Sequence, residues 1–139
     1  MSYTNTFILV APDCPVSSGI VPVRRGATET IPVIEYELLS KNPYKFTQDE
    51  LIFQTHIRRH GISPTEASRQ RAAIWTELFR KPHPCMRASA LPKKYGWGVH
   101  HDEAGKIAIY AMDSKEYAKF MQASSASPKL IFAVRSKRA

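Results

Sequence analysis

The chain contains few cysteines and no long hydrophobic segment, and each of these absences excludes a class of protein. Its 139 residues include only two cysteines, Cys14 and Cys85, far apart in the sequence. Two cysteines do not make the disulfide framework of a small secreted domain, so we expect both thiols to be reduced and buried. The apolar segment at residues 7–11 is too short to cross a bilayer, and no basic residues precede it as in a secretory signal. We therefore expect a soluble, cytoplasmic protein without membrane association.

The sequence also lacks the motifs that hold common cofactors and metals. It has no Gly-x-x-x-x-Gly-Lys loop and no dinucleotide-binding fingerprint, and Gly96-Trp97-Gly98 alone does not define a phosphate cradle. There is no Cys-x-x-Cys pair, so the nearest approach to a zinc site is His83 and Cys85 with one of His100 and His101. A strand would send those two adjacent histidines to opposite faces, and a buried thiol with surface imidazoles explains the pattern more simply. We expect no cofactor and no metal.

The residues that are present suit one globular domain with an excess of positive charge. The chain is 43% hydrophobic and 23% charged, which fits a single domain spanning residues 1–139. Twenty Lys and Arg against twelve Asp and Glu give a net charge of +8, and residues 82–139 hold ten basic residues against four acidic ones. A basic field of this kind attracts anionic partners, and it also keeps a protein soluble.

Capping signals predict three helices before residue 82. A first short helix is expected over residues 30–39, with apolar side chains at helical spacing. Thr47-Gln48-Asp49-Glu50 is a capping-box pattern, and it predicts a second helix that runs to about His60. Ser63-Pro64-Thr65-Glu66 repeats the signal with proline at the first helical position, and this third helix is expected to reach Lys81.

In the rest of the chain the hydrophobic pattern becomes strand-like. Strands are expected at residues 3–11, 86–91, 95–101, 106–112 and 129–135, with a hairpin turn around Gly105 and a helix after Asp113 or Ser114. The order β-α-α-α-β-β-β-α-β has no regular alternation of strand and helix. It predicts an α+β domain with a mostly antiparallel sheet and helices packed on one face.

Residues 91–101 carry the most informative pattern. Along a strand, Tyr95, Trp97 and Val99 would share one bulky face, while the opposite face would present two glycines and then His100. Glycine inside a strand often marks the close approach of a ligand, a backbone or a large side chain. We expect the bulky face to pack in the core and the glycine face to remain uncovered.

The glycine face and the basic residues around it predict a binding domain for an anionic ligand. A small phosphorylated molecule and an acidic protein surface both fit such a site. The candidate binding residues are Arg87, Lys93, Lys94, Gly96, Gly98, His100 and Arg135.

Two other functions remain open. A small thiol-dependent enzyme could use Cys85 with His83 or His100, because a neighbouring imidazole can activate a cysteine. His100-His101-Asp102 suggests acid/base catalysis, because a carboxylate beside an imidazole can orient it. These residues lie at the tip of the expected hairpin, however, where we expect an exposed turn and not a catalytic site. Lys93, Lys94, Tyr95 and Trp97 mix cations with aromatic residues on strand-like spacing, which suits single-stranded nucleic acid if the rings are exposed. An edge strand at residues 129–135 could also pair two copies into a homodimer.

Several motifs resemble a family of small bacterial proteins catalogued only as a domain of unknown function. The motifs are Tyr3-Thr4-Asn5-Thr6-Phe7, Ala11-Pro12-Asp13-Cys14-Pro15, Tyr36-Glu37-Leu38-Leu39, residues 91–98, Gly105-Lys106-Ile107 and residues 135–139. The resemblance covers nearly the whole chain and implies a bacterial, soluble, single-domain protein. It implies no activity, cofactor or catalytic residue.

Overall fold

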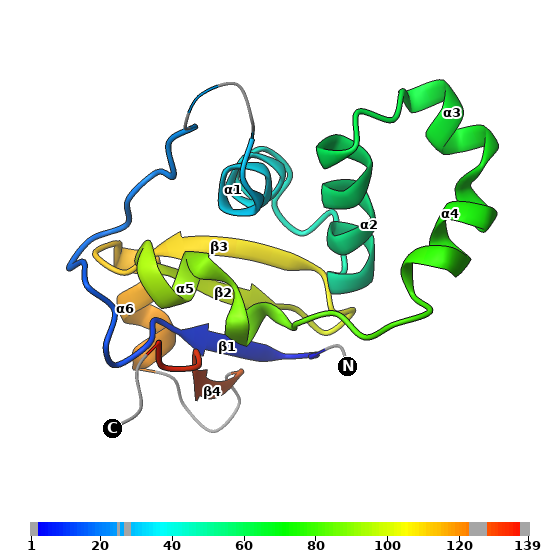
Figure 1. The fold of residues 1–139 in the computed structure, drawn as a ribbon. Coiled ribbons are helices and arrows are strands. Elements are labelled where there is room, and N and C mark those ends of the chain that lie inside the picture. The colour runs from blue at the N-terminus through cyan, green and yellow to red at the C-terminus, as the bar shows by residue number, and fades with distance from the viewer. Residues whose placement is uncertain (1–2, 25, 27–28, 123–127, 137–139) are drawn as a thin grey trace.

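The computed structural model describes residues 3–24, 26, 29–122 and 128–136, and it shows an α+β domain with four strands (Figure 1). In chain order the elements are β1 (Thr6–Leu9), α1 (Ile31–Lys41), α2 (Gln48–Arg59), α3 (Pro64–Arg69), α4 (Arg71–Leu78), the 3-10 turn η1 (Met86–Ala88), α5 (Ala90–Lys94), β2 (Trp97–His101), β3 (Ile107–Ala111), α6 (Lys115–Met121) and β4 (Lys129–Phe132). None of the helices in these described ranges has the length and apolar character needed to cross a membrane.

The sheet has the strand order β3-β2-β1-β4. Strand β2 runs antiparallel to both β1 and β3, with Ile8 opposite Val99 and Val99 opposite Ile109. Strand β4 runs parallel to β1 at the edge. The prediction of an α+β domain with a mostly antiparallel sheet is therefore confirmed.

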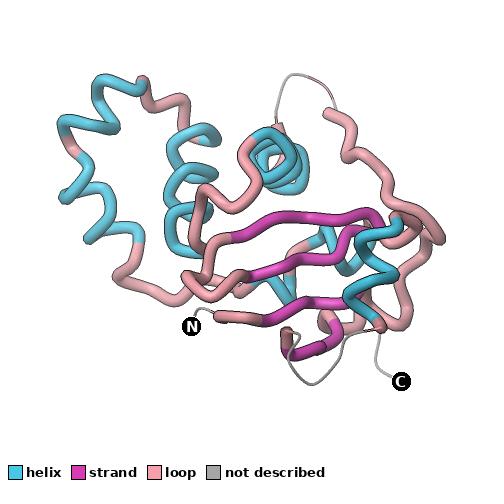
Figure 2. Tube along the Cα trace, turned by 180° about the vertical axis from the view of Figure 1, so that it is seen from behind, coloured by secondary structure: helices cyan, strands magenta, loops and turns pink. Residues whose placement is uncertain are grey.

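Helices cover both faces of the sheet rather than one, as the two opposite views show (Figures 1 and 2). On one face Ile8, Val99 and Ile107 belong to a core cluster that includes residues of α1, α2 and α5. On the other face Phe7 and Leu9 of β1 pack against α6. Every residue of β1 is buried, as the uninterrupted apolar run predicts. Because such a strand has no solvent-facing side, the expectation of helices on one face only is wrong.

The two strong capping signals form as expected. Thr47 accepts a hydrogen bond from the backbone N–H of Glu50, whose carboxylate in turn accepts from the N–H of Thr47, so the capping box is complete. Ser63 caps α3 by accepting from Glu66 N–H. The third helix is interrupted at Gln70, however, and its second part, α4, ends at Leu78 rather than Lys81.

The strand expected at residues 86–91 is absent, and this expectation is wrong. That segment forms η1 and the start of α5. The Ser89 hydroxyl caps α5 by accepting a hydrogen bond from Leu91 N–H. Pro92 lies in the first turn of this helix, where proline is tolerated because the N–H it lacks would have no partner there.

Candidate functional site

The glycine face of β2 is covered by the protein itself. A Cβ atom at Gly98 would lie 2.4 Å from Cζ of Phe7 and 2.7 Å from Cε2 of Tyr117, and one at Gly96 would lie 2.4 Å from the carbonyl oxygen of Ser18. Both glycines therefore make room for the chain's own side chains and backbone. The expectation of an uncovered glycine face is wrong, and we no longer place a ligand there.

The other residues of the candidate site from sequence are spread over several elements. Lys93 and Lys94 lie in the last turn of α5, where cations suit the helix dipole. His100 is half-buried, and its Nδ1 lies 2.8 Å from the hydroxyl of Tyr44, which also bonds the Tyr110 hydroxyl at 2.7 Å. Burial lowers the pKa of His100. These residues do not converge on one cavity.

Arg87 and Arg135 do lie together, in a shallow groove beside β4. The groove encloses about 540 Å³, and its lining residues are Pro12, Arg87, Phe132, Ala133, Val134, Arg135 and Ser136. The Nε of Arg87 donates a hydrogen bond to the carbonyl oxygen of Phe132 at 2.8 Å, and its own carbonyl accepts from Val134 N–H at 2.9 Å. Arg87 thus bonds the end of the edge strand. Its Nε is occupied by this contact.

The bulky face of β2 packs inward, as predicted. Trp97 lies against Tyr36 of α1 with ring centroids 5.1 Å apart, and its Nε1 donates to the carbonyl oxygen of Ile20 at 2.8 Å. Val99 is fully buried beside it. Trp97 is therefore partly buried against α1, and the nucleic-acid alternative stays a prediction.

A second cavity, which we call the helical pocket, lies between α1, α2, the end of α4 and residues 83–90, and it encloses about 350 Å³. Its apolar lining residues are Ile31, Pro32, Ile52, Leu78, Pro84, Ala88 and Ala90. Its polar and ionisable lining residues are Glu35, Thr55, His56, Arg59, His60, His83, Cys85 and Ser89. This volume and this mixture of walls are typical of a small-molecule site.

Glu35 is the most perturbed group in the helical pocket. It lies on α1 and accepts a hydrogen bond from the Ser89 hydroxyl at 2.7 Å. Burial raises the pKa of Glu35 to about 7, and this hydrogen bond only partly offsets the effect. Its carboxyl group forms no ion pair with the described residues. Near neutral pH the group is therefore present in both the acid and the carboxylate form.

Thr55 provides an unsatisfied hydroxyl in the same pocket. Its side chain is 8% exposed, and Oγ1 has no hydrogen-bond partner among the residues that the structure describes. A buried hydroxyl without a partner costs free energy, and a bound ligand or water would recover it. Arg59, one turn further along α2, is exposed and provides a permanent positive charge at the rim.

Three histidines add ionisable groups to the pocket wall. His56 and His60 lie one turn apart on α2 with ring centroids 4.4 Å apart. His83 comes from the segment after α4, and its Nε2 lies 2.7 Å from the carbonyl oxygen of Leu78. Burial lowers the pKa of His56, and the neighbouring His60 and His83 lower it further. These effects favour the neutral form of His56.

Cys85 and His83, paired in the thiol-enzyme alternative, both line the helical pocket. The contact that Cys85 makes, however, is with Tyr3, whose hydroxyl lies 3.4 Å from Sγ. His100, the other imidazole considered, bonds Tyr44 instead. The structure therefore brings the thiol into a cavity without placing an imidazole in hydrogen-bonding contact with it.

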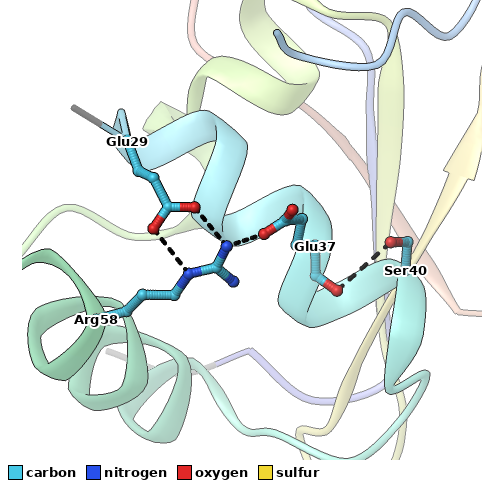
Figure 3. A network of polar contacts seen from close by, with 4 residues as sticks. All are labelled: Glu29, Glu37, Ser40 and Arg58. Atoms are coloured by element: carbon cyan, nitrogen blue, oxygen red, sulfur yellow. Dashed lines mark hydrogen bonds and ion pairs between the residues drawn. The ribbon is translucent and has the colours of Figure 1, made fainter. Parts of the chain in front are cut away.

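Arg58 fixes the relative position of the two helices that form the pocket (Figure 3). Its guanidinium donates to Glu29 at 3.0 Å and 2.5 Å and also bonds Glu37, so one side chain of α2 contacts the segment before α1 and the middle of α1. The hydrogen bonds from Arg58 lower the pKa of Glu29. This network is partly exposed and therefore contributes little to stability, but it sets the spacing of α1 and α2.

The helical pocket was missed at the sequence level, although its helical spacing was visible. Ile52, Thr55, His56, Arg59 and His60 recur at three- and four-residue intervals, which places them on one face of α2. Glu35 occupies the middle of the row Ile31-Glu35-Leu39, where an apolar residue would be usual. No local pattern reveals that these two faces meet.

The raised pKa of Glu35 predicts a stability difference that depends on pH. The folded protein holds this proton up to about pH 7, whereas the unfolded chain releases it near 4.5, so the group destabilises the fold as pH rises through that interval. We expect Glu35→Gln to raise the free energy of unfolding by about 3 kcal/mol at pH 8.5 and to have little effect at pH 4.5. Urea unfolding at both pH values measures this difference.

The control for this experiment is Glu77→Gln. Glu77 has a highly exposed side chain, and its ion pair among the described residues is with Arg80, just beyond the end of α4. Its substitution is expected to change stability little at either pH. An equal gain for Glu35→Gln at pH 4.5 and 8.5 would contradict the prediction.

Comparison with known proteins identifies the family of the chain. A family model described as a family of unknown function (DUF6157) matches residues 1–139. Searches of curated proteins and of solved structures gave no match. The resemblance noted in the sequence is confirmed, and the chain belongs to this family of unknown function, DUF6157.

Proposed function

We propose that this protein binds a small anionic molecule in the helical pocket. The observation that carries the proposal is the unpaired, buried hydroxyl of Thr55, one helical turn from the permanent charge of Arg59, with both residues lining a cavity of about 350 Å³. A hydroxyl and a guanidinium together can satisfy two acceptor atoms of an anion. The apolar walls favour a ligand that also carries a hydrocarbon part.

The rest of the lining supports the same ligand class. His56, His60 and His83 add ring nitrogens that can donate hydrogen bonds to an anion. Glu35 is the only carboxyl group that lines this pocket among the described residues, and burial favours its neutral acid form. With the charge of Arg59 and the neutral form of Glu35, the site has a net preference for negative charge near neutral pH.

A thiol-dependent enzyme is the second candidate, favoured by the presence of Cys85 and His83 in the same wall. We rank it lower because the hydroxyl of Tyr3, and not an imidazole, contacts the sulfur. The two candidates differ in the effect of Cys85→Ser. A binding protein keeps its ligand affinity after this change, whereas a thiol enzyme loses its reaction.

The proposal is tested by thermal unfolding with a panel of carboxylates and phosphate esters. A ligand at a hundred times its Kd stabilises the folded state by about 2.7 kcal/mol, which gives a clear rise in Tm. We expect Arg59→Ala and Thr55→Val to reduce the affinity for the active compounds at least tenfold. Both substitutions leave the fold intact, since Arg59 is exposed and valine matches the shape of threonine.

Arg135→Ala is the matched control, because it removes one exposed arginine from the groove beside β4 instead of the pocket. Its affinity is expected to equal that of the wild type. If Arg135→Ala abolished ligand stabilisation while Arg59→Ala kept it, the anion site would be the groove and the proposal would be wrong.

A further inference from the structure

We infer that the anion bound in the helical pocket is a monocarboxylate, and that its carboxylate shares a proton with the carboxyl group of Glu35. This inference rests on the proposed function and adds the ligand's chemical class and its coupling to protons. It starts from the hydrogen bonding of Glu35. One oxygen of this carboxyl accepts from Ser89, and the other has no partner among the described residues.

Glu35, Thr55 and Arg59 line the same cavity, so an anion bound there shares it with this carboxyl group. If Glu35 were ionised, the two negative charges would repel each other. If Glu35 is protonated, its O–H donates a short, charge-assisted hydrogen bond to the anion. Binding therefore requires one proton on Glu35, which is taken from solvent whenever the free protein is ionised there. The burial that raises the pKa of Glu35 supports this state.

The ionisable groups that face Glu35 from other elements are compatible with this arrangement. Helix α2 contributes His56, Arg59 and His60, and the segment before η1 contributes His83 and Cys85. Arg59 is the one permanent cation in this set. A single proton held between two carboxyl groups leaves one negative charge, which Arg59 balances.

The charges of the residues that line the helical pocket favour a carboxylate ligand over a phosphate monoester. A phosphate monoester carries close to two negative charges at neutral pH and offers three acceptor oxygens. The pocket has one permanent cation, and much of its wall is apolar, from Ile31 and Ile52 to Leu78 and Ala88. A carboxylate needs fewer donors, which Arg59, Thr55 and protonated Glu35 supply. Its hydrocarbon tail would cover the apolar wall.

The test uses titration calorimetry of butanoate and hexanoate at pH 8, in buffers with different ionisation enthalpies. The dependence of the observed heat on the buffer gives the number of protons taken up per ligand. We expect close to one proton for the wild type and an affinity that falls about tenfold per pH unit above pH 7. Inorganic phosphate and butyl phosphate serve as the comparison anions and are expected to bind at least tenfold more weakly.

The matched variant is Glu35→Gln, whose amide can still donate a hydrogen bond but cannot release a proton. We expect it to bind hexanoate without proton uptake and with the same affinity at pH 6.5 and pH 8.5. Proton uptake that persists in Glu35→Gln would assign the proton to the histidines and overturn the inference. The inference is also overturned if the wild type binds hexanoate without taking up a proton.

The outcomes also separate this inference from the proposed function. If butyl phosphate binds in an Arg59-dependent manner and the carboxylates do not, the helical pocket is an anion site and only the inference fails. If no anion in either class gives heat or shifts Tm, both fail.

Discussion

Replacing His101 with leucine is expected to stabilise the protein at pH 7 by about 1–2 kcal/mol and to remove a large part of its loss of stability in acid. His101 lies on β2 and is completely buried, with its ring edge against Tyr3 at a centroid distance of 5.4 Å. Neither Nδ1 nor Nε2 has a hydrogen-bond partner among the described residues. The sequence had placed this histidine in an exposed turn, and that expectation is wrong.

The direction of the acid effect follows from the pKa. Burial, assisted by the neighbouring His100, lowers the pKa of His101 to about 4 from 6.5. Between these pH values the unfolded chain binds a proton that the folded protein does not. Stability is therefore complete above pH 6.5 and is lost as pH falls towards 4. At about 1.4 kcal/mol per pKa unit, the loss amounts to about 3 kcal/mol.

Leucine has a similar volume and no polar atoms, so His101→Leu removes both the unsatisfied nitrogens and the titration. Denaturant unfolding between pH 4 and pH 8 measures the effect. The control is His60→Gln, because His60 is exposed. An acid transition of unchanged size in His101→Leu would show that other groups cause the loss.

Gly98→Ala is expected to lower the free energy of unfolding by about 3 kcal/mol. The added methyl group would lie 2.4 Å from the ring of Phe7, which is fully buried and stacked on Phe120 at 4.3 Å. It would also meet the ring of Tyr117, whose hydroxyl accepts a hydrogen bond from Val10 N–H at 2.9 Å. Neither ring can move without disturbing the packing of α6 on the sheet.

The control for this substitution is Gly61→Ala. Gly61 has a positive φ of 62°, but a Cβ atom there would have nothing within 4 Å. This variant carries only the conformational cost of a left-handed backbone, about 1 kcal/mol. Urea unfolding of both variants separates the packing cost from that conformational cost. Equal losses in the two variants would refute the close packing of Gly98.

Local signals in the sequence predicted local structure well. The capping residues Thr47 and Ser63 mark the helix starts, and Gly105 adopts the positive φ expected of the hairpin turn. Trp97 and Val99 pack inward, as their alternation indicates. The segment at residues 86–91 was assigned to the wrong class because its alternating apolar residues resemble a strand, whereas the cap at Ser89 favours a helical turn.

The candidate site was harder to predict because it depends on contacts between distant segments. The glycines of β2 suggested an opening, but glycine permits a close approach by any group, and here Phe7 and Tyr117 fill the space. The helical pocket joins Glu35 of α1 to Thr55 of α2 and to Ser89. The position of each on its helix face is visible in the sequence, whereas the docking of those faces is a tertiary property.

The double attachment of Arg87 to β4 has a consequence for how this basic molecule behaves at high concentration. Lys129 and Ala133 direct their N–H groups to β1, while the outward carbonyl of Phe132 and the N–H of Val134 are occupied by Arg87. An edge strand with unpaired N–H and C=O groups can pair with strands of other molecules, and such pairing leads to aggregation. Arg87 thus occupies the outward hydrogen-bonding groups at the end of β4. Its positive charge disfavours the approach of a second, equally basic copy to this edge.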